Sequence, residues 1–132
     1  MNQRVEVKFL EKDKFEVRAI SSETTIYVDK KEPGLAPAGP NPLELFLSSL
    51  ASCSGVFAKR YLERHNLEFK ELRIEVEAEF TTETPMRLTK IKAKVYTDAD
   101  LGGKREIFLR FIEGCPIHNT ILHTERIDIE LG

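Results

Sequence analysis

The first part of the chain alternates apolar and charged residues, the pattern of strands with one buried face. Residues 5–9 alternate Val, Val and Phe with charged neighbours, and residues 15–18 repeat the pattern after a short polar break. Residues 24–28 form a third run that is rich in β-branched side chains. These patterns predict three strands, the first two joined as a hairpin.

A long loop and then a long helix follow. Residues 30–40 contain three prolines and two glycines, which interrupt helices and strands alike, so this segment is predicted to be a lid or binding loop. Asn41 suits a helix N-cap, Pro42 the first helical position and Glu44 the acid of a capping box. The apolar spacing carries this helix to residue 64 or 65, where Asn66 suits a left-handed end.

The second half of the chain predicts two strands, two short helices and a closing strand. In residues 74–80 the polar positions are Glu, and in residues 90–95 they are Lys, so a hairpin would set Glu against Lys on a solvated face. Helices are predicted over 104–113 and 116–122, and a strand over 126–131. The order β-β-β-α-β-β-α-α-β defines an α+β fold, and the length predicts a single domain over residues 1–132.

Composition narrows the classes of function. The 132 residues include 20 Lys and Arg against 22 Asp and Glu, a net charge of −2, which argues against a nucleic-acid partner. No apolar run approaches the length of a membrane span, so no membrane partner is expected. Two cysteines behind a charged start that does not resemble a signal peptide predict free thiols and a cytoplasmic location.

The two cysteines are the strongest candidates for chemistry. Phosphate-loop, dinucleotide and Cys-x-x-Cys motifs are absent, and the three histidines lack metal-ligand spacing, so neither a cofactor nor a metal is expected. Cys115 precedes a proline as a helix N-cap would, where N–H groups and the helix dipole favour a thiolate. Cys53 lies about three turns inside its helix, so activating it requires a cation: Arg18 is the best candidate, and Arg60 and His118 are weaker ones. Either thiol could instead be a small core residue.

Three stretches together resemble the OsmC/Ohr family of organic hydroperoxide reductases. They are residues 39–46, Gly-Pro-Asn-Pro-Leu-Glu-Leu-Phe, residues 50–53, Leu-Ala-Ser-Cys, and residues 114–117, Gly-Cys-Pro-Ile. The order of predicted elements matches that family along the whole chain. The resemblance implies a long central helix packed on antiparallel sheet and an intertwined homodimer with two active sites at its interface.

The resemblance also implies a reaction. Cys53 becomes the thiolate that attacks organic or hydrogen peroxide and passes through a sulfenic acid, and Cys115 resolves it as a disulfide that a dithiol or thioredoxin-like reductant reopens. Arg18 and Glu44 are the candidates for the family's Arg and Glu. The family's Glu stands ten residues before the peroxidatic Cys, where this chain has Leu43. Glu44 lies about half a turn round the helix from Cys53 and roughly 13 Å along its axis, so it could reach a Cys53 thiol only across a dimer. That departure motivates an alternative function, a non-enzymatic dimeric binding or stress protein.

Overall fold

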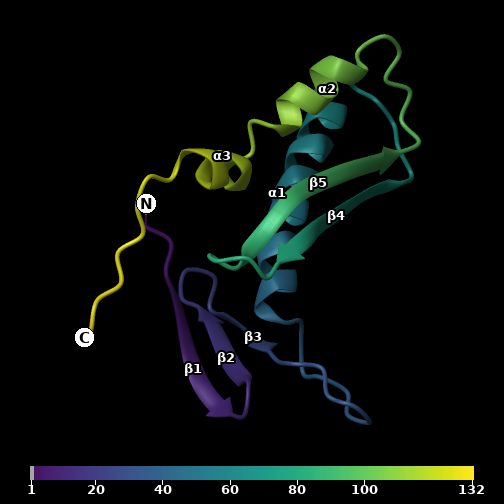
Figure 1. Ribbon diagram of the computed structural model, residues 1–132. Coiled ribbons are helices and arrows are strands. Elements are labelled where there is room, and N and C mark those ends of the chain that lie inside the picture. Colours follow the sequence, from purple (N-terminus) through teal and green to yellow (C-terminus); the bar gives the residue numbers. More distant parts are fainter. Residues whose placement is uncertain (1) are drawn as a thin grey trace. The chain divides into compact units, whose positions relative to one another are not determined.

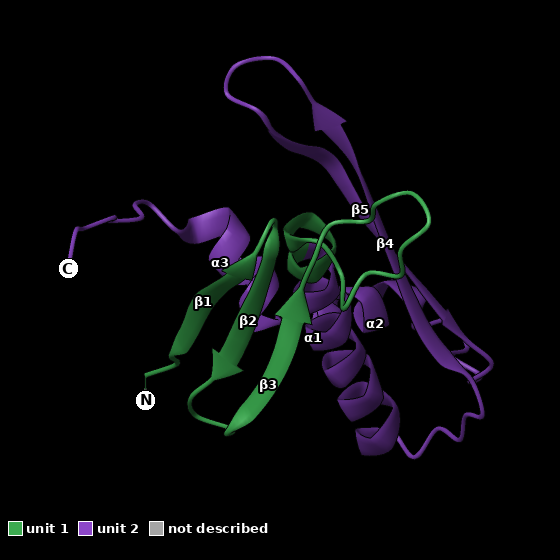
Figure 2. Ribbon diagram, turned by 90° about the horizontal axis from the view of Figure 1, so that it is seen from below, with its two compact units in different colours: residues 1–46 green, residues 47–132 purple. Residues whose placement is uncertain are grey.

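The computed structural model describes residues 2–132 and forms two compact units (Figures 1 and 2). The first unit ends at Phe46 and the second runs from Leu47 to Gly132. The elements follow in the order β1, β2, β3, α1, β4, β5, α2, α3. The single domain expected over residues 1–132 stays a prediction.

The first unit is a three-stranded antiparallel sheet in the order β1-β2-β3. Its strands are β1 (Val5–Glu11), β2 (Lys14–Ala19) and β3 (Thr24–Val28). Val17 pairs with Val7 on one side and with Ile26 on the other, so the apolar positions of all three strands share one face. This agrees with the three strands and the hairpin that the alternation predicts.

The loop after β3 folds back onto its own strand. The Asp29 carboxylate accepts hydrogen bonds from the backbone N–H groups of Lys30 at 2.8 Å and Ala38 at 2.9 Å, which lower the pKa of Asp29. The N–H of Asp29 donates to the carbonyl of Pro40 at 3.1 Å. Gly39 lies so near the carbonyl of Tyr27 that a Cβ would be 1.9 Å from its oxygen. Only glycine therefore fits at residue 39.

The helix α1 (Pro42–Arg64) begins and ends as the local sequence predicts. Asn41 Oδ1 accepts from the N–H of Glu44 at 2.8 Å, and Glu44 Oε1 accepts from the N–H of Asn41 at 3.0 Å, a reciprocal capping box. At the other end Asn66 takes a φ of 54°, and the N–H of Leu67 donates to the carbonyl of Leu62 at 2.9 Å. This left-handed ending satisfies carbonyls that the helix leaves open.

The second unit contains the hairpin of β4 (Leu72–Thr81) and β5 (Arg87–Thr97). The predicted facing of Glu and Lys is confirmed where Glu75 lies opposite Lys94 and Glu77 lies opposite Lys92. A register shift beyond Glu77 sets Glu79 opposite Thr89 instead of Lys90. Both side chains are exposed, so the ion pair that Lys90 still forms with Glu79, 3.2 Å from Nζ to Oε2, adds little to stability.

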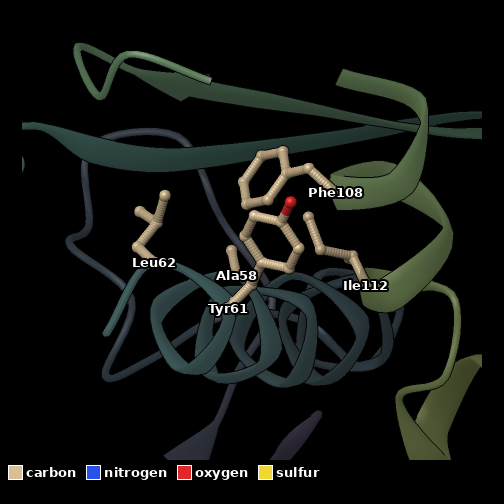
Figure 3. Close-up of a cluster of buried hydrophobic side chains, with 5 residues drawn as sticks. All are labelled: Ala58, Tyr61, Leu62, Phe108 and Ile112. Atoms are coloured by element: carbon tan, nitrogen blue, oxygen red, sulfur yellow. The ribbon is translucent and has the colours of Figure 1, made fainter. Parts of the chain in front are cut away.

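The helices α2 (Arg105–Ile112) and α3 (Pro116–His123) complete the second unit. Its core is a cluster from the later turns of α1 and from α2, in which the Tyr61 ring meets the Phe108 ring at 5.2 Å (Figure 3). Leu72 of β4 and Val95 of β5 pack against this cluster. Figure 1 shows α1 along the hairpin, as a helix packed on antiparallel sheet requires. The cluster consists of Ala58, Tyr61, Leu62, Phe108 and Ile112.

The prediction of a strand over residues 126–131 is wrong, because the structure assigns no strand there. The segment after α3 forms no ladder, and its apolar side chains are exposed: Ile127 to 81%, Ile129 to 93% and Leu131 to 101%. Alternation supplies the propensity for a strand, but a strand also needs an edge to pair with. No described strand of this chain pairs with it.

Candidate dithiol site

Cys115 is the N-cap of α3, as the sequence predicts. Its backbone is extended, with φ −61° and ψ 135°, and Pro116 occupies the first turn. The Cys115 Sγ accepts a hydrogen bond from the backbone N–H of His118 at 3.4 Å, and the residue is 0% exposed. A buried thiol therefore caps this helix, a role that a hydroxyl or carboxylate group commonly has at a helix start.

Cys53 lies on α1 and is partly exposed. Although far from it in sequence, Cys115 lies close enough to Cys53 to raise the pKa of its thiol, and both thiols are free. The backbone N–H of Ile117 also lies close enough to Cys53 to lower the pKa of its thiol. The first turn of α3 thus places one N–H near each sulfur, that of Ile117 near Cys53 and that of His118 on Cys115.

The environment of Cys53 raises the pKa of its thiol. Burial is the largest cause, followed by the side chain of Cys115. The N–H of Ile117 and the positive charge of Arg60 act in the opposite direction, because both stabilise a thiolate. The balance favours the protonated form of Cys53 in this reduced chain.

Arg60 is a cation of the second unit that lowers the pKa of Cys53. It lies two turns further along α1, with its guanidinium over the Phe57 ring at 5.2 Å from the centroid. Sequence reasoning ranked it below Arg18. It missed the N–H of Ile117 altogether, although the predicted helix start at Cys115 was a signal for free N–H groups there.

The other two predicted site residues belong to the first unit. Arg18 is an exposed residue of β2, opposite Glu6 on β1 and Thr25 on β3. Glu44 is the acid of the capping box, which accounts for its place in the sequence without a catalytic role. The structure brings Cys53 and Cys115 together, and the roles of Arg18 and Glu44 stay predictions.

A groove of about 490 Å³ lies between α1, β5, α2 and α3. On α1 its wall is Leu50 and Ser54, the residues one turn before and directly after Cys53. Most of the lining is apolar, and its ionisable side chains are Lys90, Glu113 and His118. The groove therefore offers an apolar compartment beside the dithiol site. Its remaining lining residues are Leu88, Thr89, Ile91, Ala93, Val95, Leu109, Ile112, Ile121 and Leu122.

The described part of the chain contains no candidate metal site and no candidate membrane-spanning helix. Among residues 2–132, no group of three or more His, Cys, Asp and Glu side chains lies close enough to hold a metal ion. Within the same residues, no helix is both long and apolar enough to cross a membrane.

Two free thiols that meet at a helix start, in an α+β chain with a long helix on an antiparallel hairpin, define a dithiol protein. The family model described as OsmC-like protein matches residues 30–131. The chain belongs to the OsmC-like family. A comparison with curated proteins gives no match.

Solved structures show the same fold at low sequence identity. An OsmC-like protein from Mycoplasma pneumoniae is 19% identical with a TM-score of 0.80, covering 94% of this chain and 89% of that one. The organic hydroperoxide resistance protein OsmC from Legionella pneumophila is 15% identical with a TM-score of 0.66, covering 93% and 90%. OhrB of Bacillus subtilis, also an organic hydroperoxide resistance protein, is 18% identical with a TM-score of 0.57, covering 94% and 93%. At these identities the likeness establishes the fold alone.

Proposed function

We propose that this protein is a thiol-dependent peroxidase that reduces organic hydroperoxides or hydrogen peroxide in defence against oxidative stress. The observation that carries the proposal is the meeting of Cys53 and Cys115 at the first turn of α3. Membership of the OsmC-like family and two structural neighbours named as hydroperoxide resistance proteins support it. Two free cysteines also fit a reducing compartment such as the cytoplasm.

The proposed reaction has two steps. The Cys53 thiolate attacks the terminal peroxide oxygen, an S–O bond forms as the O–O bond breaks, and the products are the Cys53 sulfenic acid and an alcohol, or water from hydrogen peroxide. The Cys115 thiol then attacks the Cys53 sulfur and releases water, which leaves a disulfide. A dithiol or thioredoxin-like reductant supplies the two electrons that restore both thiols. Atoms and electrons balance with the peroxide as the only oxidant.

Cys53 must become a thiolate despite its raised pKa. The Ile117 N–H and Arg60 supply part of the stabilisation within the second unit. We infer that Arg18 adds to it in the assembled protein, and that Glu44 holds the Arg18 guanidinium as its ion-pair partner; both roles are the ones suggested by resemblance.

We infer that the working unit is a homodimer. The segment from residue 126 to residue 131 alternates apolar and charged side chains, yet its apolar side chains are exposed and it has no ladder partner among the described residues of its own chain. A strand edge of a second copy would pair its backbone and cover Ile127, Ile129 and Leu131. Removing residues 125–132 is therefore expected to yield monomers in sedimentation, whereas a truncated chain that stays dimeric would contradict this route.

Peroxide consumption tests the activity. The full reduced chain is mixed with cumene hydroperoxide or hydrogen peroxide and either dithiothreitol or dihydrolipoamide, and the loss of peroxide is followed. Cys53→Ser is expected to reduce consumption to the uncatalysed rate. Equal consumption by Cys53→Ser and the parent would rule the proposed function out.

The raised pKa of Cys53 and the Leu43 departure favour a second candidate, a non-enzymatic dimeric binding or stress protein that kept the fold and the groove. In that case peroxide would be consumed no faster than by a small thiol at the same concentration. Apolar ligands would still bind the groove, and Cys53→Ser would leave that binding unchanged. The two candidates therefore separate in one pair of assays.

A further inference from the structure

Four residues of α1 share one narrow face of the helix, here called the Cys53 face: Cys53, Phe57, Arg60 and Arg64. They stand at positions i, i+4, i+7 and i+11, and at 100° per residue they lie within about 60° of one another around the helix axis. The face begins at the partly exposed sulfur and continues toward the end of the helix. A molecule that reacts at Cys53 and extends along this face therefore meets its two arginines.

Both guanidiniums of the Cys53 face lie over aromatic rings. That of Arg60 is 5.2 Å from the centroid of Phe57, and that of Arg64 is 5.5 Å from the centroid of Phe111 on α2. The two rings are 5.8 Å apart, so one aromatic pair supports both cations. Contact with the face of a ring positions a guanidinium without neutralising its charge or using its N–H donors.

Neither arginine has an acidic partner within the chain. Both are exposed, and no carboxylate of the described residues 2–132 forms an ion pair with either guanidinium. On another face of the same helix the chain does supply such a partner, because Lys59 Nζ lies 3.0 Å from Glu63 Oε1. Two like charges four positions apart destabilise a helix, so Arg60 and Arg64 together carry a cost that a bound anion would remove.

The guanidinium of Arg60 is within reach of a reactant at Cys53. Phe57, whose ring supports it, follows Cys53 by about one helical turn, roughly 6 Å along the axis. Side chains of a helix lean toward its N-terminal end, which from Arg60 is the direction of Cys53. The charge of Arg60 also lowers the pKa of the Cys53 thiol, an independent sign that the two groups are near each other. A short hydrocarbon arm therefore spans the distance between them.

We propose that Arg60 and Arg64 bind the carboxylate of an organic hydroperoxide whose peroxide group reacts at Cys53, a role that rests on the proposed peroxidase function. A planar guanidinium matches a carboxylate with two parallel N–H donors, and the hydrocarbon arm between carboxylate and peroxide lies along Phe57. A dithiol reductant that carries a carboxylate offers the same chemistry. The site is assigned to the oxidant because the oxidant reacts at Cys53 alone, whereas a reductant attacks a disulfide that Cys53 shares with Cys115.

The test compares two oxidants that differ in charge. 4-Carboxycumene hydroperoxide and its methyl ester carry the same peroxide on the same ring, but only the first is an anion. Reduced full-length protein is mixed with each oxidant below saturation in single turnover, and the rate of Cys53 oxidation is measured. The parent is expected to prefer the anion although its own net charge is −2. This preference should fall as salt is added, because salt screens exposed charges.

The readout for each variant is the ratio of its two rates, which cancels any effect of Arg60 on the pKa of Cys53. Arg60→Gln and Arg64→Gln are each expected to reduce this ratio about threefold, the scale of an exposed ion pair, and the double variant about tenfold. Lys59→Gln is the matched control, because it removes a cation of the same helix that lies off the Cys53 face. It is expected to keep the parent ratio.

Several outcomes would overturn the proposal. Equal rates of the parent with both oxidants, or arginine variants that keep the parent ratio, would leave the two arginines without a carboxylate to bind. An equal loss in Lys59→Gln would assign the preference to the general charge of the helix.

A second arm of the experiment separates the oxidant from the reductant. The disulfide form of each protein is reduced with dihydrolipoate, an anion, or with neutral dihydrolipoamide. A charge preference that depends on Arg60 and Arg64 in this arm alone would assign the site to the reductant and overturn its assignment to the oxidant. If neither hydroperoxide oxidises parent Cys53 faster than it oxidises a small thiol, the proposed function itself fails, which differs from every outcome in which Cys53 reacts without a charge preference.

Discussion

The two cysteines occupy opposite kinds of environment although their side chains meet. Cys115 is fully buried, caps α3 and receives an N–H from His118. Cys53 is partly exposed within α1, where burial by its neighbours and the Cys115 thiol raise its pKa. The accessible sulfur therefore lacks intrinsic activation, and the sulfur at the helix start lacks access. This difference suggests a division of labour in which Cys53 meets the substrate and Cys115 waits behind it.

If the two cysteines have these separate roles, the largest expected effect is on the turnover of a variant that lacks Cys115. Cys115→Ser is expected to leave the first oxidation of Cys53 near the parent rate, because the substrate side is intact. Recycling would lose an intramolecular partner and slow by about 10²-fold or more, since a thiol held in place acts at a very high effective concentration. Stopped-flow single turnover and steady-state peroxide loss measure the two steps. A variant impaired equally in both would contradict separate roles.

Alkylation of the reduced protein gives the next largest contrast. Iodoacetamide is expected to modify Cys53 in the folded protein and Cys115 only after opening, because Cys115 is 0% exposed. If Cys115 reacts only through global unfolding, its alkylation is expected to be at least about 10³-fold slower than that of Cys53. Mass mapping of the modified peptides over time measures both rates. Comparable rates would mean that α3 opens readily and that its thiol is not sheltered.

Local chemistry in the sequence was enough to predict several boundaries. Asn41, Pro42 and Glu44 define the start of α1, and Asn66 defines its end, because capping depends on residues a few positions apart. The Cys115-Pro116 pair likewise predicts the start of α3. The strand over 126–131 was wrong for this chain because pairing depends on a distant edge that no local pattern encodes.

The candidate site was only partly predictable for the same reason. Family resemblance singled out Cys53 and Cys115, but their contact comes from the packing of α3 near α1. One group that lowers the pKa of Cys53 is the backbone N–H of Ile117, and a backbone group leaves no mark in residue type. Sequence reasoning ranked Arg60 below Arg18, because distance along the chain does not reveal which cation lies close enough to a thiol to lower its pKa.

Stability should also distinguish the two sulfurs, by a smaller margin. Cys115→Ala removes a buried cap and leaves a small void, so it is expected to cost about 2 kcal/mol of the free energy of unfolding. Cys53→Ala removes a partly exposed side chain inside a helix and is expected to cost less than about 1 kcal/mol. Urea unfolding of the reduced variants measures both. Cys115→Ser, which keeps a capping atom, should fall between Cys115→Ala and the parent, and equal costs for both alanine variants would remove the structural half of the comparison.

The smallest expected effect concerns the charge that opposes the raised pKa of Cys53. Arg60→Ala removes a group that lowers this pKa, so the thiolate becomes scarcer and alkylation of Cys53 near neutral pH should slow by about twofold. Because a raised pKa delays ionisation, the rate should keep rising with pH beyond the range of an ordinary thiol. The difference between parent and variant should vanish once both are ionised.

Arg64→Ala is the matched control for this prediction. Arg64 lies one turn further along α1 with its guanidinium over the Phe111 ring at 5.5 Å, much as Arg60 lies over Phe57 at 5.2 Å, yet it is not among the groups with the largest effects on the pKa of Cys53. Its loss should therefore leave the pH profile of Cys53 alkylation unchanged. Equal slowing by both variants would point to lost packing on α1, and Arg60→Lys, which keeps the charge, should restore the parent profile only if charge is the cause.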